Sequence, residues 1–375
     1  MKLIVDSGQL LRAADMLRKV IPSKPVLPIM ECIRVENTSD YMATLTACDT
    51  EHALSILCPM TEITDWNTVC LPGSYLTDAL RSIPEQPVVI KIDENLNVTV
   101  RHQTGEVSFM AQPADEFPAL TDASAAQPLF TIPLDRLITL CRIVPPFSAN
   151  DELRPVLNGS AIDINPQGLV CVGSDGHRLM KVTLTDVTSA ERHSIILPRR
   201  SFTLLQQWQK RGSVPVSVSL LGNDCLFSID GLTLRCRLTE GRYPNYNAVI
   251  PLNHDHRVTV DREQLIRSVD SVSSFGSRTS PIAVLQADGD HMNVRAEDLD
   301  FSTRAHDTIP VQTNFSNPLS IGFQAPFLTS MLSQFPCQEV TLELQDAQRA
   351  CVVRYDAPES AMQMTALLMP VTIAS

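Results

Sequence analysis

One unit occurs three times along this chain, and the repetition restricts its fold more than any other feature. Each copy opens with a stretch whose apolar residues recur at helical spacing, centred on Leu10-Leu11, Leu137-Ile138 and Leu265-Ile266. These pairs lie 127 and 128 residues apart. Such a period in a chain of 375 residues predicts three similar domains in tandem rather than one large core.

A strand, a polar turn and a second strand come next in each copy. In the central copy the turn Gly173–Leu179 lies between two apolar runs, 168–172 and 180–184, that are typical of buried strands. Gly176 supplies the permissive backbone that a tight bend needs. The segment 47–54 matches this turn closely, and 296–302 is a weaker third copy.

A second helix and a closing strand complete each copy. The helical stretches are 72–83, 198–208 and 325–335, each with a proline at or just before its start, where a fixed φ suits helix entry. The closing strands are expected at 106–111, 232–238 and 362–369. Four elements in one order, three times, predict an α+β fold with domains 1–125, 126–252 and 253–375. The alternative is three unrelated α+β domains.

Cysteine usage and hydropathy limit the cellular compartment that we expect for this chain. The ten cysteines include no C-x-x-C pair and no cluster with zinc spacing, so we expect free, mostly buried thiols in a reducing cytoplasm, without metal or cofactor. No apolar run reaches about 18 residues, which predicts no transmembrane helix and no membrane partner. Asp6 interrupts the apolar N-terminus and argues against a signal peptide.

The charge is unevenly distributed. The net charge of −12 alone argues against a nucleic-acid partner, because phosphates attract cations. However, segment 10–24 carries +3 and segment 198–213 carries +4, which leaves −19 for the rest of the chain. Basic helices on an acidic body fit a protein that holds DNA loosely, without reading bases. Solvated helix faces are the alternative, and segment 324–337 carries no charge at all.

The central turn also contains the residue types of a hydrolase. Ser174, Asp175 and His177 lie within four positions, but no G-x-S-x-G motif is present, and so short a stretch cannot fold its own side chains into a triad. No glycine pattern of a phosphate-binding loop occurs either. Asp298 and Asp300 are interpreted as solvated turn carboxylates rather than metal ligands. We therefore expect a protein that is not an enzyme.

Several pieces of the chain, in order and spacing, resemble one family. The chain is similar over its whole length to the bacterial DNA polymerase III β subunits, the processivity sliding clamps. The pieces that carry the resemblance are 23–29, Leu157-Asn158-Gly159, Ser174–Leu179, Glu240–Tyr246 and Leu367–Val371.

The resemblance implies a head-to-tail homodimer that forms a six-domain ring, with helices inside and antiparallel sheets outside. Such a ring encircles double-stranded DNA without sequence preference. It tethers the polymerase III α subunit, and the other implied partners are the clamp loader and further polymerases and repair proteins with clamp-binding motifs.

The same resemblance implies a peptide-binding pocket between the second and third domains. Its residues here would be Leu157, Ser174, Gly176, His177, Arg178, Leu179, Pro244, Val249, Leu367, Met369 and Pro370. The apolar members suit short apolar ligands, although an interdomain core uses the same residue types. The chain departs from the family pattern at Pro155, Val156, Ala248 and Thr372, which bears on peptide preference and leaves a divergent paralogue as an alternative.

Two further sets of residues complete the hypothesis. The DNA-contacting cations would be Lys24, Arg154, Arg199 and Arg200. The dimer interface is expected to place Val107 and Phe109, on an edge strand, against Phe275, because an unpaired edge favours pairing across subunits. The rival functions are a clamp-like peptide-binding scaffold that does not enclose DNA, and a hydrolase using His177.

Overall fold

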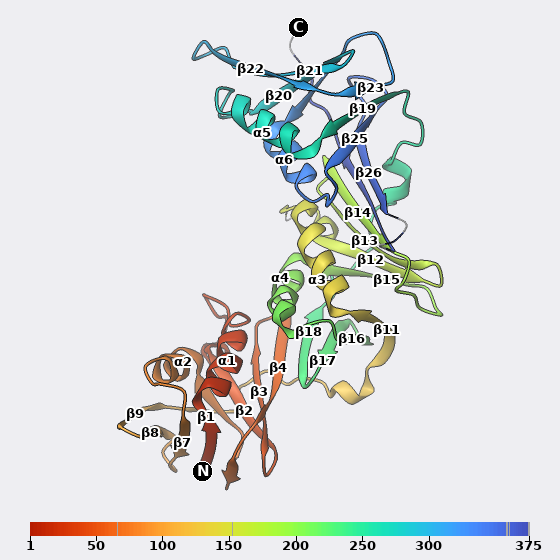
Figure 1. Ribbon diagram of the computed structural model, residues 1–375. Helices are drawn as coiled ribbons and strands as arrows, with labels where there is room; N and C mark the ends of the chain where they lie inside the picture. Colours follow the sequence, from red (N-terminus) through yellow and green to blue (C-terminus); the bar gives the residue numbers. More distant parts are fainter. Residues whose placement is uncertain (66, 152, 358, 360, 374–375) are drawn as a thin grey trace. The chain divides into compact units, whose positions relative to one another are not determined.

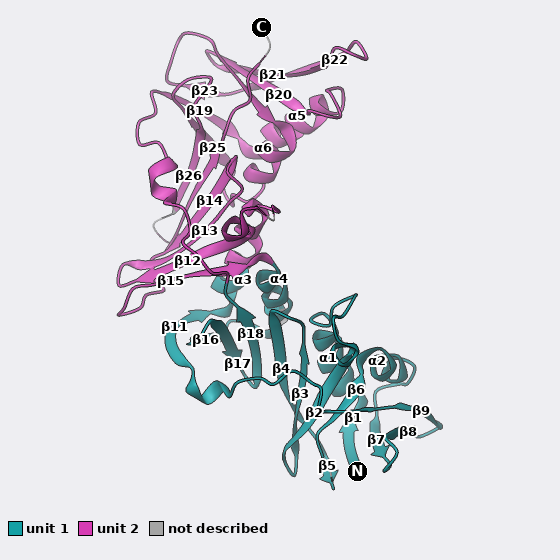
Figure 2. Ribbon diagram, turned by 180° about the vertical axis from the view of Figure 1, so that it is seen from behind, with its two compact units in different colours: residues 1–138, 200–238 teal, residues 139–199, 239–375 magenta. Residues whose placement is uncertain are grey.

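The protein folds into two compact units in a computed structural model that describes residues 1–65, 67–151, 153–357, 359 and 361–373. One unit comprises residues 1–138 and 200–238, and the other comprises residues 139–199 and 239–375 (Figure 2). Both consist of antiparallel sheets with helices packed on them (Figure 1). Within the described residues, no helix combines the length and the apolar character needed to cross a membrane.

In the part of the chain that the structure describes, six helices recur in pairs. Asp6 accepts a hydrogen bond from the Gln9 amide at the start of the first helix, and Asp261 accepts one from Gln264 at the start of the fifth. The helices are α1 (Ser7–Arg18), α2 (Gly73–Arg81), α3 (Leu134–Ile143), α4 (Arg199–Leu205), α5 (Arg262–Ser273) and α6 (Ala325–Leu332). Helix α1 packs against α2, and α5 packs against α6.

The first unit contains two sheets. A five-stranded sheet has the order β5-β1-β7-β8-β9, and a nine-stranded sheet has the order β10-β6-β2-β3-β4-β18-β17-β16-β11. The strands are β1 (Lys2–Asp6), β2 (Cys32–Ser39), β3 (Met42–Cys48), β4 (His52–Pro59), β5 (Glu62–Thr64), β6 (Val69–Pro72), β7 (Pro87–Ile92), β8 (Asn97–His102), β9 (Gly105–Met110), β10 (Gln112–Pro113), β11 (Gln127–Pro133), β16 (Pro215–Leu221), β17 (Asp224–Ile229) and β18 (Leu232–Arg237).

The second unit also contains two sheets. Their orders are β15-β12-β13-β14-β27-β26-β25-β19-β23 and β22-β21-β20-β24. The strands are β12 (Gly159–Asn165), β13 (Gly168–Ser174), β14 (Arg178–Leu184), β15 (His193–Pro198), β19 (His256–Asp261), β20 (Ile282–Asp288), β21 (His291–Asp298), β22 (Thr303–Pro310), β23 (Gln312–Thr313), β24 (Leu319–Gln324), β25 (Glu339–Leu344), β26 (Cys351–Ala357) and β27 (Met362–Leu368).

The threefold repetition predicted from the sequence is confirmed. Each copy follows the order strand, helix, four strands, helix, three strands, with the two-residue or three-residue strands β5, β10 and β23 as additions. The second helix of the central copy is shorter than predicted, because the chain tightens into a 3₁₀ helix at Gln206–Arg211. The two compact units divide the central copy between them, so the three-domain boundaries stay a prediction.

Two long sheets are continuous from one repeat to the next. Strand β4 pairs with β18, from His52 opposite Cys236 to Ile56 opposite Leu232. In the same manner β14 pairs with β27, from Arg178 opposite Leu368 onward. In each case the strand after the polar turn joins the closing strand of the following copy. The corresponding strands at the two ends, β22 and β9, lie at sheet edges.

The cysteines lie in the cores, as expected. All ten are free; nine are buried and Cys337 is partly exposed. Cys32, Cys48 and Cys70 belong to one apolar cluster beneath β2, β3 and β6. Burial, followed by the nearby Asp49 carboxylate, raises the pKa of the Cys48 thiol to about 11.

Candidate functional site

The polar turn has the same hydrogen bonding in all three repeats. One aspartate carboxylate oxygen accepts two backbone N–H groups, from the residues two and three positions later, which is the arrangement of an Asx turn. The contacts are Asp49 with Glu51 and His52 at 2.7 and 2.6 Å, Asp175 with His177 and Arg178 at 2.9 and 2.7 Å, and Asp298 with Asp300 and Phe301 at 2.9 and 3.1 Å. The weak third copy of the turn is therefore a true structural equivalent.

Arg178 joins the central turn to helix α6. Its Nε donates to Asp175 Oδ2 at 2.9 Å, and Nη2 donates to the Pro146 carbonyl at 3.2 Å. The guanidinium carbon lies 4.0 Å from the centre of the Phe327 ring, within the range of a cation–π contact. Arg178 is thus held inside the protein, as a link between repeats, and offers little of its charge to a ligand.

The neighbouring residues do not form a hydrolase site. The Ser174 hydroxyl donates to the Arg178 carbonyl at 2.8 Å, and the Asp175 carboxylate is used by Arg178 rather than by the His177 ring. Gly176 has φ of +91°, which a side chain rarely adopts, so its predicted role in the bend is confirmed. His177 is exposed beside it.

Four separate pieces of the predicted pocket meet around this turn. The Met369 amide donates to the His177 carbonyl at 2.9 Å, which ties the C-terminal segment to the turn. A Cβ on Gly176 would lie 3.1 Å from Arg154 Nη1, and one on Gly241 would lie 2.8 Å from Val156 Cγ1. The 3₁₀ helix at Pro155–Asn158 therefore lies beside both the turn and the segment that leads to Pro244 and Val249.

Burial divides the predicted pocket residues into three groups, of which Ser174, Arg178 and Pro370 are half-buried. Leu157, Leu179 and Leu367 are buried, and the last two form a cluster with Val172, Ile250 and Ala350. The exposed group contains Gly176, His177, Pro244, Val249 at 58% exposure and Met369 at 40%. The leucines thus form the base, and the exposed residues are the ones that a ligand can reach. We call this exposed group the 177/369 surface.

The residues that depart from the family pattern lie on or near this surface. Pro155 and Ala248 are exposed, and Val156 packs on Gly241. Thr372 is exposed in the segment after Pro370. They alter the rim of the 177/369 surface rather than its buried base.

The equivalent turn of the first repeat is closed by a buried hydrogen-bond chain. His52 Nδ1 lies 3.2 Å from Asp49 Oδ1, and His52 Nε2 lies 2.9 Å from Ser201 Oγ on α4. Burial raises the pKa of Asp49, but hydrogen bonds from His52 and Glu51 outweigh that effect and lower it. The connectivity is that of a catalytic triad, yet His52 and Ser201 are both buried, which leaves a substrate no access.

The contact between His52 and Ser201 was not predicted from the sequence. They are 149 residues apart and carry no local motif. The only available signal was the alignment of repeats, in which His52 occupies the position of Arg178.

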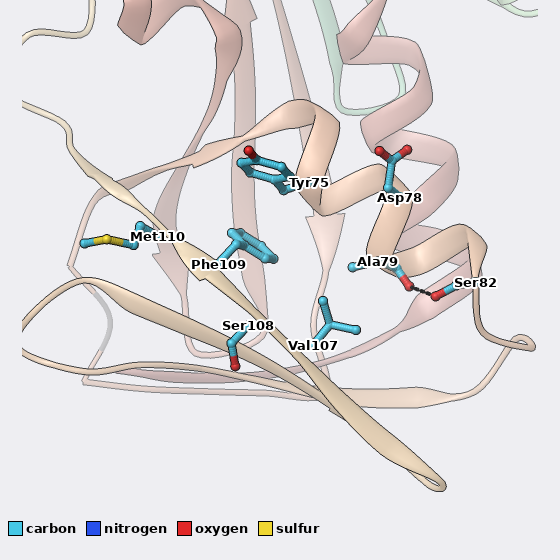
Figure 3. Close-up of a pocket in the computed structure, with 8 residues that line it drawn as sticks. All are labelled: Tyr75, Asp78, Ala79, Ser82, Val107, Ser108, Phe109 and Met110. Carbon is cyan, nitrogen blue, oxygen red and sulfur yellow. Dashed lines mark hydrogen bonds between the residues drawn. The ribbon is translucent and has the colours of Figure 1, made fainter.

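A groove lies between α2 and the edge strand β9 (Figure 3). It has a volume of about 670 Å³, and Val107 and Phe109 point into it while Ser108 points to the other face. The Phe109 ring lies 6.1 Å from that of Tyr75, centre to centre. Tyr75 is 60% exposed, so the groove presents a large aromatic surface to solvent.

The other predicted interface residue lies near the edge strand β22. Phe275 is 53% exposed, and its carbonyl accepts a hydrogen bond of 2.8 Å from Thr303 Oγ1 at the start of that strand. In the adjoining turn Phe301 is 79% exposed. Strand β22, like β9, therefore lies at a sheet edge beside aromatic side chains: the exposed Phe275 and Phe301 for β22, and the half-buried Phe109 with the exposed Tyr75 for β9.

The four cations predicted to contact DNA differ in their surroundings. Arg154 pairs with Asp151 at 2.8 Å. Arg200 donates to the Val20 carbonyl at 2.9 Å and pairs with Asp49 at 3.1 Å, so it also holds the first repeat together. Lys24 and Arg199 are exposed, and no carboxylate among the described residues pairs with either. Within the same residues, no group of three or more His, Cys, Asp or Glu side chains could hold a metal ion.

The repeated architecture and its two open edges are those of a multi-domain clamp, and comparison with known proteins agrees. The N-terminal, central and C-terminal domains of the DNA polymerase III beta subunit match residues 1–121, 131–245 and 247–372. The chain belongs to the DNA polymerase III beta subunit family.

Individual relatives are distant in sequence but similar in fold. The Beta sliding clamp of Haemophilus influenzae is 23% identical over 94% of this chain and 95% of its own length. That of Synechocystis is 24% identical over the full length of both. The crystal structure of the Pseudomonas aeruginosa subunit superposes with a TM-score of 0.92 at 22% identity, covering 99% of this chain and 100% of its own. A Pseudomonas aeruginosa clamp bound to griselimycin has the same TM-score and identity, with both chains fully covered.

Proposed function

We propose that this chain is a processivity sliding clamp without chemistry of its own. Two copies join head to tail into a ring around duplex DNA, and the 177/369 surface tethers the polymerase III α subunit, the clamp loader and other partners through short peptide motifs. Family membership supports this function, because the matching domains are those of the DNA polymerase III beta subunit. We call the contact between the polar turn of one repeat and the second helix of the next repeat a joint. The observation that carries the function is that this joint occurs twice within the chain, while helix α2 of the first repeat and the turn of the last repeat each present one exposed half of it.

The joint has two parts, a turn and a helix. In the first joint the turn residue His52 contacts Ser201, the third residue of α4. In the second, Arg178 contacts Phe327, the third residue of α6. The third residue of α2 is Tyr75, and the third turn contains Phe301; both are exposed. In a head-to-tail dimer, Tyr75 of one copy therefore meets Phe301 of the other. This contact corresponds to those that the chain makes within itself at the first two joints.

The internal sheet pairings also support a register for the third joint. His52, Arg178 and Thr303 are the first residues of β4, β14 and β22. Their partners in the first two joints are Cys236 and Leu368. Phe109 occupies in β9 the place that Cys236 has in β18: it is the penultimate residue of the closing strand and lies beside the third residue of the preceding helix. In the second joint Leu368 is the last residue of its strand. On the pattern of the first joint, we infer that Thr303 of one copy lies opposite Phe109 of the other.

This register brings matching chemistry together. Ala305 of one copy falls opposite Val107 of the other, on the face that carries the helices. The Thr303 hydroxyl holds the backbone of Phe275 in its own copy, so under this register Phe275 approaches the groove of the other copy (Figure 3). On the outer face Arg304 falls opposite Ser108, and His306 opposite Glu106. The face toward the groove is mainly apolar, with Thr303 as its polar member, and the outer face is polar, as expected of a stable interface.

The DNA contact rests on charge alone. Lys24 and Arg199 are the exposed cations of the proposed set that no described carboxylate pairs with, and an acidic remainder of the chain repels DNA elsewhere. Reversing both charges, in Lys24→Glu with Arg199→Glu, should lower affinity for duplex DNA and reduce the salt slope by about one per lost phosphate contact. Arg192→Glu with Arg349→Glu reverses two exposed arginines outside the proposed set and serves as the charge-matched control. Equal loss in the control would show that only total charge matters.

The peptide contact is tested by fluorescence anisotropy. A labelled peptide of five or six residues with Gln and Leu or Phe anchors should bind with a Kd on the order of 1 μM. His177→Ala should raise that Kd about fivefold, the equivalent of one ordinary hydrogen bond. His291→Ala, an exposed histidine on β21, is the matched control. No binding by the wild-type protein, or equal effects of both variants, would contradict this assignment.

A further inference from the structure

The C-terminal segment is anchored on both sides of Met369 and Pro370. On one side the Met369 amide donates to His177 on the polar turn. On the other the Val371 amide donates to the Gly322 carbonyl at 2.8 Å, in an isolated antiparallel bridge to β24. The segment thus crosses from the long sheet that contains β27 to the four-stranded sheet that ends in β24.

The second anchor depends on the absence of a side chain at Gly322. A Cβ built there would lie 2.9 Å from Ile373 Cγ1, and 3.3 Å from both Val371 Cγ2 and the Val371 carbonyl oxygen. Gly322 is buried, while Val371 and Ile373 are half-buried over it. Gly322 lies in a strand and is not among the glycines of positive φ, so it is needed for space rather than for backbone conformation.

We propose that Gly322 and Ile373 form a latch that positions Met369 and Pro370 for peptide binding. The two are positioning residues, which reach the ligand only through the segment that they hold. The inference rests on the proposed peptide-binding function of the 177/369 surface. A segment fixed at both ends loses less conformational freedom when a peptide binds, so the latch raises affinity by preorganisation.

The test uses Gly322→Val in the full chain, with Ser320→Val as the matched control. Ser320 lies two positions earlier on the same face of β24, where it pairs with Gln286. Amide hydrogen exchange, measured by NMR, reports the latch directly. Gly322→Val should accelerate exchange at Val371 and at Met369 at least tenfold, while Ser320→Val leaves both within about twofold of the wild type.

Peptide affinity provides the second readout, with the same labelled motif peptide. Gly322→Val should raise the Kd about threefold to tenfold, the scale of ordering a few side chains, and leave the dimer unchanged by light scattering. By linkage, adding peptide to the wild-type protein should slow exchange at Val371, which no ligand contacts directly under this proposal.

Two results would overturn the latch. One is faster exchange at Val371 with unchanged exchange at Met369 and unchanged Kd, because the segment would then be held from the turn alone. The other is unchanged exchange at Val371 in Gly322→Val. If the wild-type protein binds no motif peptide, the proposed function fails, and the exchange measurements still decide whether Gly322 holds the segment.

Discussion

The two closed joints of this chain share a backbone and differ in chemistry. At the first, Asp49 orients His52, which reaches Ser201 through a buried hydrogen-bond chain. At the second, Asp175 orients Arg178, whose guanidinium stacks on Phe327. The first is sealed, whereas the second lies beside the exposed His177 and Met369. Repetition of the turn preserves the joint, while the side chain three positions after the aspartate differs: His52 is buried in the first and Arg178 is half-buried in the second.

The third joint sharpens this comparison, because its two halves lie at opposite ends of the chain and both are exposed. Replacing Phe109 by Asp should weaken self-association at least a hundredfold, since a charge would enter the centre of an apolar contact. Combined with Phe275→Asp it should give monomers at low micromolar concentration by analytical ultracentrifugation.

Ser108→Asp is the control for this prediction. Ser108 lies on the same strand but faces away from the groove (Figure 3), and the inferred register places it opposite Arg304 of a second copy. The control should therefore retain the dimer. A dimer that survives Phe109→Asp with Phe275→Asp would remove these residues from the interface.

At the sealed joint we expect a large effect on stability. His52→Ala removes a buried ring and leaves Ser201 without that hydrogen bond, which should lower the free energy of unfolding by about 2–4 kcal/mol in urea titrations. His177→Ala, at an exposed position of the second turn, should change it by less than about 0.5 kcal/mol. Similar values for the two variants would mean that the first joint contributes little to stability.

The stacked joint should be more tolerant. Arg178→Lys keeps the charge but loses the planar contact with Phe327 and the forked geometry toward Asp175, at a cost of about 1–2 kcal/mol. Differential scanning calorimetry should show a lower Tm for this variant. An unchanged Tm would indicate that charge alone holds the turn to α6.

Alkaline pH should distinguish the two turns by a smaller effect. Cys48 precedes Asp49, whereas Ser174 precedes Asp175. Burial is the main reason why the pKa of Cys48 is raised to about 11 in the folded protein, whereas the unfolded-state pKa is near 9. The contribution of this thiol to the free energy of unfolding is therefore complete below about pH 9 and is lost as the pH rises from there toward 11. The loss cannot exceed about 1.4 kcal/mol per pH unit for this thiol. Cys48→Ser should show a shallower decline in stability between pH 9 and 11, and an identical slope would contradict the assignment.

Local patterns predicted the repeated elements well and the joints poorly. Helices such as α1 and α5 were evident because apolar residues recur at helical spacing. Leu179 and Leu367 were correctly grouped, but their residue type could not tell a pocket wall from a buried base. The contacts of His52 with Ser201 and of Arg178 with Phe327 join distant repeats, and only the folded sheets bring them together.

The central claim is that the third joint closes head to tail between two copies around DNA. Its most direct test is the double variant Phe109→Cys with Thr303→Cys, diluted to monomers, mixed with nicked circular DNA and then oxidised. Native thiols interfere little, since nine of the ten are buried. We predict covalent dimers without larger oligomers. The crosslinked rings should stay on the circle in denaturant until the DNA is linearised, whereas each single variant should stay uncrosslinked. Dimers of a single variant, or equal retention on linear and circular DNA, would contradict the account.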